Sequence, residues 1–354
     1  MKKVIKVIIF NIVLLLILLS LLEGLLFLLV RNPDILKQCP QRIGNMIGYI
    51  YARERPIIKF EPACARYDPT IGYTLKPGSC NFGGREFMNR YDINSMGTRD
   101  DEASLQHPEI VVAGDSFAMG WGVNQEETFV KQLEKKMGIK VLNAAVASYG
   151  TAREMMILHR LPTDRMKYLI IQYCGNDIDE NREFYLNHNR LPIMSSQQYR
   201  EYQELYKDSL QYFFGKYLWI KIKKRWDENE QRRGQSGVVT DRDEIDLFLN
   251  AVQNSGLDLG KVTIITFVMN GRNPADNKDF PAGLKKKLAA GNYPPYLKNM
   301  IVLDFSDQLQ KQHFYILDDH INALGHKIIA DTLAKVIEAR RTPQLVPDYN
   351  RRHP

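Results

Sequence analysis

A serine, a histidine and neighbouring carboxyl groups occur in patterns that could carry out acyl transfer. Ser116 ends a Gly-Asp-Ser tripeptide, and His320 follows two consecutive aspartates near the other end of the chain. Acyl transfer to a serine hydroxyl needs a base that removes its proton and an acid that orients the base. Ser116 is therefore the candidate nucleophile, and His320 is the candidate base. Asp318 is the preferred acid, and Asp319 is the alternative.

The same chemistry needs hydrogen-bond donors for the oxyanion that forms on the ester. The tripeptide Gly-Asn-Asp at 175–177 carries Asn176, whose side-chain amide could donate toward the serine. The loop at 143–151 is rich in small residues, and its backbone N–H groups are further candidate donors. His326 is a rival base, but we expect it to pack or cap inside the last helix.

The candidate residues stand at the ends of predicted secondary-structure elements. Short, almost continuously apolar runs predict buried parallel strands, and they alternate with helical stretches. The strands are expected at 110–113, 140–143, 168–173, 262–268 and 300–304, and the helices at 127–136, 152–161 and 324–340. This alternation predicts a three-layer α/β/α fold with a central parallel sheet. Each candidate follows a strand or precedes a helix, so all could meet at one edge of the sheet.

Three blocks of the chain together resemble the SGNH/GDSL hydrolase family. They are the Gly-Asp-Ser tripeptide, the Gly-Asn-Asp tripeptide and the pattern Asp-x-His-x-Asn-x-x-Gly-His at 318–326. The resemblance covers roughly residues 108–341, apart from most of an insertion, and it implies a flavodoxin-like sheet. The segment before this region also looks like that of membrane-tethered bacterial members. The resemblance implies ester hydrolysis or acyl transfer, often of acetyl groups.

The resemblance also implies a role for each site residue. By this resemblance Ser116 is the nucleophile and donates its own backbone N–H to the oxyanion. Asn176 donates its side-chain amide to the same oxyanion. His320 is the base, and Asp318 orients it.

Two positions of the family pattern stay open. An alignment that starts from Asn143 puts the glycine of the second block at Ser148, and Gly150 follows two residues later. Only a backbone N–H is required there, so either Ser148 or Gly150 can be the third donor. In many relatives the acid stands three residues before the histidine, where this chain has Leu317. The acid is therefore one of the two aspartates that follow, and Asp318 is preferred.

Residues 1–31 form a separate segment. Three lysines precede an apolar run at 7–30 that is long enough to cross a bilayer. The run is too long for the apolar region of a signal peptide, and no small-x-small cleavage site follows it. We expect an uncleaved signal anchor in a bacterial inner membrane, with residues 31–354 on the periplasmic side. Glu23 is expected to be a tolerated carboxyl near the helix end rather than the partner of another helix.

The rest of the chain divides into three further parts. Residues 32–106 carry many turn signals and predict an extended lead-in of strands and turns. The hydrolase domain is expected at 107–341, with an insertion at about 181–245 and a tail at 342–354. Within the insertion, an aromatic and basic stretch at 212–226 is interpreted as a helix packed on the domain with a solvated basic face. A cap over the site or a membrane-surface helix is the alternative.

Composition sets limits on compartment and partners. One disulfide is expected among Cys39, Cys64 and Cys80, with Cys64–Cys80 closing the shorter loop, and Cys174 is expected to be a buried thiol. No cofactor is expected, and no metal site either, because no Cys or His pair has zinc-ligand spacing. The net charge of +7 and the pI near 9.0 come without a nucleic-acid motif. Attraction to anionic lipid or an acidic envelope polymer is favoured over nucleic acid.

These observations favour a membrane-anchored serine esterase or O-acetyltransferase that acts on acetylated envelope glycan. The main alternative is a catalytically silent envelope module that binds polysaccharide or an assembly partner. A cytoplasm-facing lipid esterase is expected only if the anchor inserts the other way. The acyl group, the acceptor and the oligomeric state are left open.

Overall fold

The computed structural model describes residues 2–233, 243–271 and 277–341. The tail predicted at 342–354 lies outside these described residues. So does the part of the predicted insertion at 234–242.

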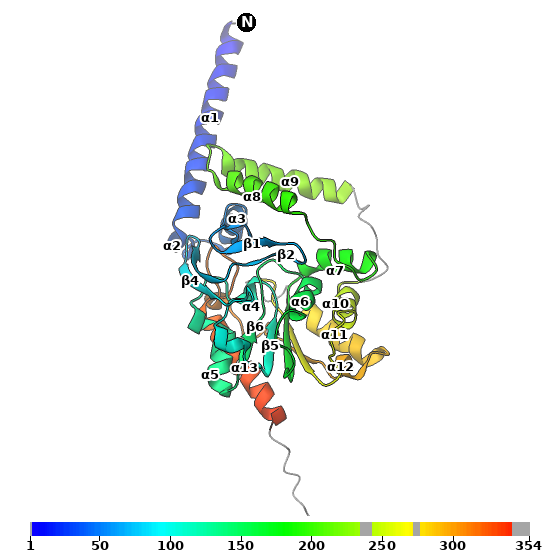
Figure 1. Ribbon diagram of the computed structural model, residues 1–354. Coiled ribbons are helices and arrows are strands. Elements are labelled where there is room, and N and C mark those ends of the chain that lie inside the picture. Colours follow the sequence, from blue (N-terminus) through cyan, green and yellow to red (C-terminus); the bar gives the residue numbers. More distant parts are fainter. Residues whose placement is uncertain (1, 234–242, 272–276, 342–354) are drawn as a thin grey trace, which may run out of the picture.

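A five-stranded, fully parallel sheet forms the centre of the molecule (Figure 1). The strands lie in the order β6-β5-β7-β8-β9 and comprise β5 (Ile110–Ala113), β6 (Val141–Asn143), β7 (Tyr168–Tyr173), β8 (Thr263–Val268) and β9 (Ile301–Leu303). Most strand residues are buried, as expected for a sheet that is covered on both faces. Counted in chain order, the strands follow the 2-1-3-4-5 order of flavodoxin-like folds. The predicted α/β fold with a central parallel sheet is confirmed.

The register of the sheet brings the candidate loops together. Val112 of β5 pairs with both Asn143 of β6 and Ile170 of β7, and Tyr173 of β7 pairs with Val268 of β8. Parallel strands end at the same edge of a sheet, so the loops that follow β5, β6 and β7 leave it side by side. These loops carry three of the candidate blocks.

Helices flank the sheet on both sides (Figure 1). On one side α5 (Phe129–Met137) packs against α13 (Ala323–Arg341), and the other side carries α6 (Thr151–Leu158), α7 (Asp177–Leu186) and α10 (Glu244–Gln253). Beside β8 and β9 lie α11 (Asp279–Ala290) and α12 (Pro295–Lys298). The short helix α4 (Ser116–Met119) follows β5 directly. The strand and helix positions agree with the sequence prediction to within a few residues.

The N-terminal helix α1 (Lys2–Arg31) projects from the body of the molecule (Figure 1). Its most apolar window has a mean hydropathy of 3.0, and the helix is long and apolar enough to span a membrane. Residues 2–22 are exposed along their whole length, whereas Glu23 and the residues near the end of the helix are buried against the protein. The apolar run therefore divides into a bare part and a covered part.

The segment between α1 and the sheet is only partly extended. It begins with helices, α2 (Pro33–Leu36) and α3 (Gln41–Ala52), and a short 3₁₀ turn η1 (Ile58–Phe60). The prediction of strands and turns throughout 32–106 was wrong for this first part. The apolar residues of α3 recur at helical spacing and bury Ile47, Ile50 and Tyr51 against α1.

Two antiparallel hairpins complete this segment. They are formed by β1 (Ala65–Asp68) with β2 (Gly72–Leu75) and by β3 (Gly78–Gly83) with β4 (Met88–Ile93). A disulfide joins Cys64 to Cys80, and Cys39 and Cys174 are free thiols. The hairpins contribute their buried side chains to the main hydrophobic core. Short 3₁₀ turns follow at η2 (Glu102–Leu105), η3 (Gln125–Glu127) and η5 (Lys311–His313).

The insertion forms two long helices, α8 (Ser196–Leu210) and α9 (Lys216–Arg233), which lie crosswise to α1 and extend to one side of it, and α9 contacts α1 (Figure 1). Glu23 accepts hydrogen bonds from the backbone N–H groups of Tyr217 (3.1 Å) and Leu218 (3.0 Å), at the start of α9. The first N–H groups of a helix have no partner within the helix, and a carboxylate satisfies them. The expectation that Glu23 pairs with no other helix was therefore wrong.

A second, smaller hydrophobic cluster forms where α1, α3 and α9 meet. Its buried members include Leu26 and Leu29 of α1, Ile47 of α3 and Tyr217 of α9. Leu317, from the loop before α13, belongs to the same cluster. We call this group the anchor-side cluster. It connects the N-terminal helix to the loop that carries Asp318.

Candidate active site

Ser116 is the first residue of α4, in the sharp turn after β5. The side chain of Asp115 caps this helix by accepting the N–H of Phe117 at 3.0 Å. Gly114 is required by close approach, because a Cβ there would lie 2.6 Å from Ala118 and 2.8 Å from Gln172. The sequence therefore produces a tight strand-to-helix turn that presents the Ser116 hydroxyl at the edge of the sheet.

The structure brings Ser116, His320 and Asp318 into one line of hydrogen bonds. Nε2 of His320 lies 2.7 Å from Oγ of Ser116, and Nδ1 lies 2.5 Å from Oδ1 of Asp318. A carboxylate can only accept, so Nδ1 carries the proton and Nε2 is free to accept the serine proton. This is the hydrogen-bond reach that a general base requires.

The two aspartates before His320 differ in position. Oδ1 of Asp319 lies 3.5 Å from Nδ1 of His320, and the Asp319 side chain is 48% exposed. Asp318 is closer and its side chain is only 1% exposed. The geometry therefore favours the preferred acid over the alternative.

Two aromatic rings lie against the histidine. The ring centroid of His320 lies 4.5 Å from that of Phe117 and 5.0 Å from that of Trp121, and the Trp121 ring is stacked on the imidazole. The Trp121 indole also donates its N–H to Oδ2 of Asp318 at 3.2 Å. Trp121 thus orients both the candidate base and the candidate acid.

Arg55 is the positively charged partner of Asp318. Its guanidinium donates to Oδ1 of Asp318 at 3.0 Å and to Oδ1 of Asp319 at 2.6 Å. Burial alone would raise the pKa of Asp318, but His320 and Arg55 outweigh this effect and hold the pKa well below its usual range. Asp318 is therefore ionised whenever the protein is folded near neutral pH.

Glu86, in the turn between β3 and β4, holds the backbone of the acid-bearing loop. Its carboxylate accepts the N–H groups of Ile316 (2.7 Å), Leu317 (2.8 Å) and Asp318 (2.8 Å). Burial raises the pKa of Glu86, and these backbone donors oppose that rise. Three donors on one carboxylate fix the position from which Asp318 meets His320.

The candidate oxyanion donors after β6 are not equivalent. Gly150 donates its N–H to Oε1 of Glu180 at 3.0 Å, so this N–H is not available to an oxyanion. Ser148 has a positive φ of 63° and is exposed, and its N–H has no hydrogen-bond partner in the part of the chain that the structure describes. Tyr73 of β2 braces this loop by donating its hydroxyl to the carbonyl of Ala147 at 2.6 Å. The geometry favours Ser148 over Gly150 as the third donor.

Asn176 lies beside the nucleophile turn. Asn176 is exposed, and its side-chain amide lies close enough to the buried carboxyl of Asp115, the residue before Ser116, to lower the pKa of that carboxyl. Burial raises the pKa of Asp115, whereas the N–H of Phe117 and the amide of Asn176 oppose the rise. The loop after β7 is fixed from β8, because Asn270 accepts the N–H of Gly175 at 2.6 Å.

The rival base lies in a different environment. His326 is buried in α13, and its Nδ1 accepts the backbone N–H of Phe129 at 3.1 Å. Burial lowers the pKa of His326 to about 3, so its imidazole stays neutral. This agrees with the expected packing role.

One group of side chains has the spacing of a cation site. Asp318, Asp319 and His320 offer ligand atoms within 4.8 Å of one another. The guanidinium of Arg55 binds both carboxylates, and Nδ1 of His320 is bonded to Asp318. The positive charge that these carboxylates need is therefore supplied by a side chain.

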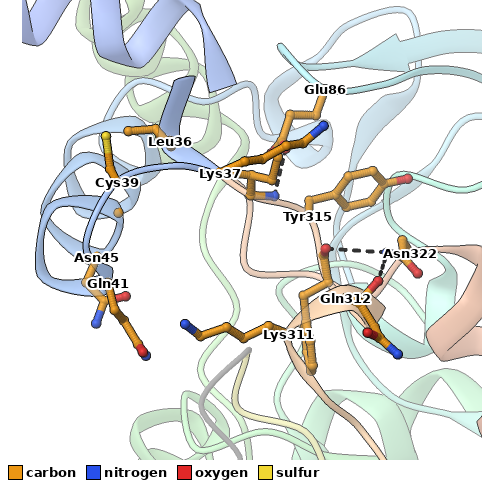
Figure 2. Close-up of a pocket in the computed structure, with 13 residues that line it drawn as sticks. Leu36, Lys37, Cys39, Gln41, Asn45, Glu86, Lys311, Gln312, Tyr315 and Asn322 are labelled. Atoms are coloured by element: carbon orange, nitrogen blue, oxygen red, sulfur yellow. Dashed lines mark hydrogen bonds between the residues drawn. The ribbon is translucent and has the colours of Figure 1, made fainter. Parts of the chain in front are cut away.

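A cavity of about 560 Å³ lies behind the acid-bearing loop, and Ser116, His320 and Asp318 are not among its lining residues. Figure 2 shows Glu86 and Tyr315 at one wall, with Lys311 extending toward Gln41 of α3. The cavity shares Glu86 and Ile316, which support the acid-bearing loop, with the surroundings of the Ser116 site. It is a separate hollow on the anchor side of the loop.

Sequence reasoning missed three supporting residues. Trp121 stands five positions after Ser116, and its closeness to the nucleophile was a usable signal. Arg55 and Glu86 lie in the segment before the sheet, in no motif and far from His320 in sequence. Only the folded chain shows that this segment reaches the site.

Comparisons with known proteins give similarity at the level of fold. No model of a known protein family matches the sequence, and no curated protein matches it. Among solved structures, the chain is similar to a protein assigned to the G-D-S-L family of lipolytic proteins from Desulfitobacterium hafniense DCB-2. That match has 14% identity and a TM-score of 0.34, and it covers 64% of this chain and 98% of the other.

A second solved structure is that of a carbohydrate esterase whose active site has catalytic and non-catalytic binding functions. It matches with 13% identity and a TM-score of 0.31, over 66% of each chain. The fold assignment rests on the chain's own sheet order, with Ser116 directly after β5 and His320 directly before α13. The chain has a flavodoxin-like α/β/α fold, which is the fold that the resemblance to SGNH/GDSL hydrolases implies.

Proposed function

We propose that this protein is a membrane-anchored serine ester hydrolase or acyltransferase. The single observation that carries the proposal is the continuous path from Oγ of Ser116 through His320 to an ionised Asp318. Four further residues support this path from outside it, namely Arg55, Glu86, Trp121 and Phe117. A chance contact between a serine and a histidine would not have such support. A binding module would not need this arrangement.

The proposed reaction begins with attack of Ser116 Oγ on the carbonyl carbon of an ester, while Nε2 of His320 takes the hydroxyl proton. The carbonyl oxygen becomes an oxyanion, for which the N–H groups of Ser116 and Ser148 and the amide of Asn176 are the proposed donors. The C–O bond to the leaving alcohol then breaks, and His320 returns the proton to the alkoxide. An acyl-enzyme on Ser116 remains.

The second half of the reaction releases the acyl group. A water molecule or an acceptor hydroxyl loses its proton to His320 and attacks the acyl carbon, and the bond to Ser116 Oγ breaks. Ser116 recovers the proton from His320. Hydrolysis and transfer differ only in which hydroxyl attacks.

The proposed substrate is an acetylated glycan of the bacterial envelope, and the proposed location is the inner membrane with the catalytic domain in the periplasm. An apolar helix that can span a membrane supports the anchor. The Cys64–Cys80 disulfide supports an oxidising compartment, because such bonds persist outside the cytoplasm. The net charge of +7 suits an acidic polymer. A reporter domain fused after Pro354 would reveal the orientation through its activity on either side of the membrane.

The catalytic test is Ser116→Ala in the full-length protein, assayed on an aryl acetate and on acetylated glycans. We expect kcat to fall by about 10⁴–10⁶, because the nucleophile is lost. Ser79→Ala, which removes an exposed serine of β3, should leave kcat unchanged.

A serine-directed fluorophosphonate provides a second readout that does not depend on the substrate. The Ser116 oxygen would form a bond to phosphorus as fluoride leaves, so stoichiometric labelling of the wild type and none of Ser116→Ala is expected. Near-wild-type turnover by the alanine variant would rule out the assignment. A folded wild type with neither turnover nor labelling would instead support a silent binding module.

A further inference from the structure

The outer face of α9 carries large apolar side chains that no other part of the described chain covers. Trp219 is 48% exposed, Ile222 is 49% exposed and Trp226 is 60% exposed. These three residues are spaced by three and four positions, so they share one face of the helix. Lys223 and Arg225 are exposed beside them. We call Trp219, Ile222, Lys223 and Trp226 the outer face of α9.

The opposite face of α9 is fixed to the protein. Tyr217 is buried, and its hydroxyl donates to Glu54, after α3, at 3.1 Å. Lys224 lies over the ring of Tyr49 in α3, 4.2 Å from its centroid. Ile220 packs against the anchor-side cluster. The helix is therefore docked by one face, and its outer face points away from the body.

The position of α9 along α1 matches the edge of a bilayer. Residues 2–22 of α1 are bare and, at 1.5 Å per residue, extend about 31 Å, of which the apolar residues 7–22 account for about 24 Å. The hydrocarbon core of a bilayer is about 30 Å thick. The bare part ends at Glu23, the residue that accepts the first N–H groups of α9. The helix α9 thus starts where the membrane-water interface would lie and extends sideways from α1 (Figure 1).

The composition of this face suits the lipid interface. Tryptophan is enriched at membrane-water interfaces, where its ring is apolar and its N–H can meet a headgroup. Basic side chains beside an apolar stripe attract anionic lipids, and helices of this kind lie in the interface plane. The exposed aromatic residues Phe213 and Phe214, just before α9, extend the apolar surface.

We propose that the outer face of α9 binds the anionic surface of the same bilayer that α1 spans. The inference rests on the anchor in the proposed function, but not on the catalytic roles. With two contacts, α1 and α9, the domain is held in one orientation. The loop that carries Asp318 packs through Leu317 on the anchor-side cluster, so the candidate active site is connected to the anchored end of the domain.

The test uses tryptophan fluorescence of the full-length protein in phosphatidylcholine vesicles, with and without phosphatidylglycerol. The chain has three tryptophans, and Trp121 is buried at the active site. Lipids that carry a quencher at the headgroup or in the upper acyl chain should quench Trp219 and Trp226. The double variant Trp219→Phe with Trp226→Phe retains Trp121 alone and should lose this quenching.

A charge variant tests whether the basic side chains of α9 attract anionic lipid, or whether α9 only lies near the bilayer. Lys223→Glu with Arg225→Glu should abolish the gain in quenching that phosphatidylglycerol produces. The matched control is Lys285→Glu with Lys286→Glu, a pair of exposed lysines on α11, and it should retain that gain. Equal loss in the control would mean that only the net charge matters and would overturn the proposal.

Insertion of α1 is measured separately by resistance of the protein to alkaline extraction from the vesicles. If the protein resists extraction but Trp219 and Trp226 respond only to an aqueous quencher, the proposal for α9 is wrong and the anchor stands. If the protein is extracted, both the anchor and the proposal for α9 fail. Turnover of an aryl acetate in the same vesicles reports independently on the proposed catalysis.

Discussion

At the scale of single residues, the acid of the candidate triad is defined by its neighbours. Two consecutive aspartates precede His320, and sequence alone left both as candidates. Arg55 binds both carboxylates, but Asp318 is buried, accepts from Trp121 and faces the imidazole, whereas Asp319 is half exposed. Two adjacent carboxyl groups thus have separate environments and separate expected functions.

Paired substitutions at the two aspartates test this distinction. Asp318→Asn should reduce kcat on an aryl acetate by about 10³–10⁴, because the imidazole loses the acceptor that fixes its tautomer. Asp319→Asn should reduce it by less than about tenfold, because a half-exposed charge contributes little. Steady-state kinetics that give kcat and KM separately provide the measurement. Equal losses in the two variants would contradict the assignment.

At the scale of secondary-structure elements, the sheet positions the candidate catalytic residues, and the segment with α3 and the hairpins supplies residues that support them. The sheet and its loops position Ser116, Asn176 and His320. Arg55 comes from the chain after α3, and Glu86 comes from the β3–β4 turn. The segment before the sheet is therefore a working part of the candidate active site rather than a spacer.

Removal of the Glu86 carboxylate should impair the site by displacing the acid-bearing loop. Glu86→Ala leaves the three backbone N–H groups of residues 316–318 without their acceptor. We expect kcat to fall by about 10²-fold, because small misplacements of catalytic groups are costly. Fluorophosphonate labelling of Ser116 should slow in parallel.

The conservative variant Glu86→Gln keeps one acceptor oxygen and should recover part of the labelling rate. The control is Glu102→Ala, which removes an exposed carboxylate that accepts from Ser95. A Glu86→Ala protein with normal kcat and normal labelling would show that the loop keeps its position without this carboxylate.

At the scale of the whole molecule, the core contains a buried carboxyl group that lowers the free energy of unfolding as the pH rises. Glu154 is 1% exposed, and neither of its carboxyl oxygens has a hydrogen-bond partner in the described part of the chain. Burial, together with the nearby Asp177, raises its pKa well above the ordinary value of 4.5. The folded protein therefore holds a proton on Glu154 that the unfolded chain releases.

The sign of the pH dependence follows from this proton. Below pH 4.5 the side chain of Glu154 is protonated in both the folded and the unfolded state, so its ionisation does not lower the free energy of unfolding. As the pH rises, the unfolded chain ionises first, and the free energy of unfolding falls by about 1.4 kcal/mol per pH unit until the folded pKa is reached. Glu154→Gln should therefore raise Tm more at pH 8 than at pH 5.

Thermal unfolding at the two pH values measures the effect. The control is Glu126→Gln, at an exposed position in η3, and its change in Tm should be the same at both values. A Glu154→Gln protein whose change in Tm is equal at pH 5 and pH 8 would show that Glu154 is not protonated in the fold.

Local sequence determined the parts of this protein that depend on short-range pattern. The apolar runs specified the five strands, because a strand buried on both faces has to be apolar along its length. The long N-terminal run specified a helix that can span a membrane, since length and hydropathy decide that property. The Gly-Asp-Ser turn and the pattern around His320 were visible for the same reason. Each lies within a few residues.

Tertiary structure alone decided which distant groups meet. It paired Glu23 with the start of α9 and Gly150 with Glu180. It also brought Arg55 and Glu86 to Asp318. No local pattern encodes these contacts, because their energy comes from burying charged and polar groups against partners that chain topology supplies. The sequence therefore identified the candidate nucleophile and the candidate base, and the fold favours one of the two candidate acids and supplies the residues that support it.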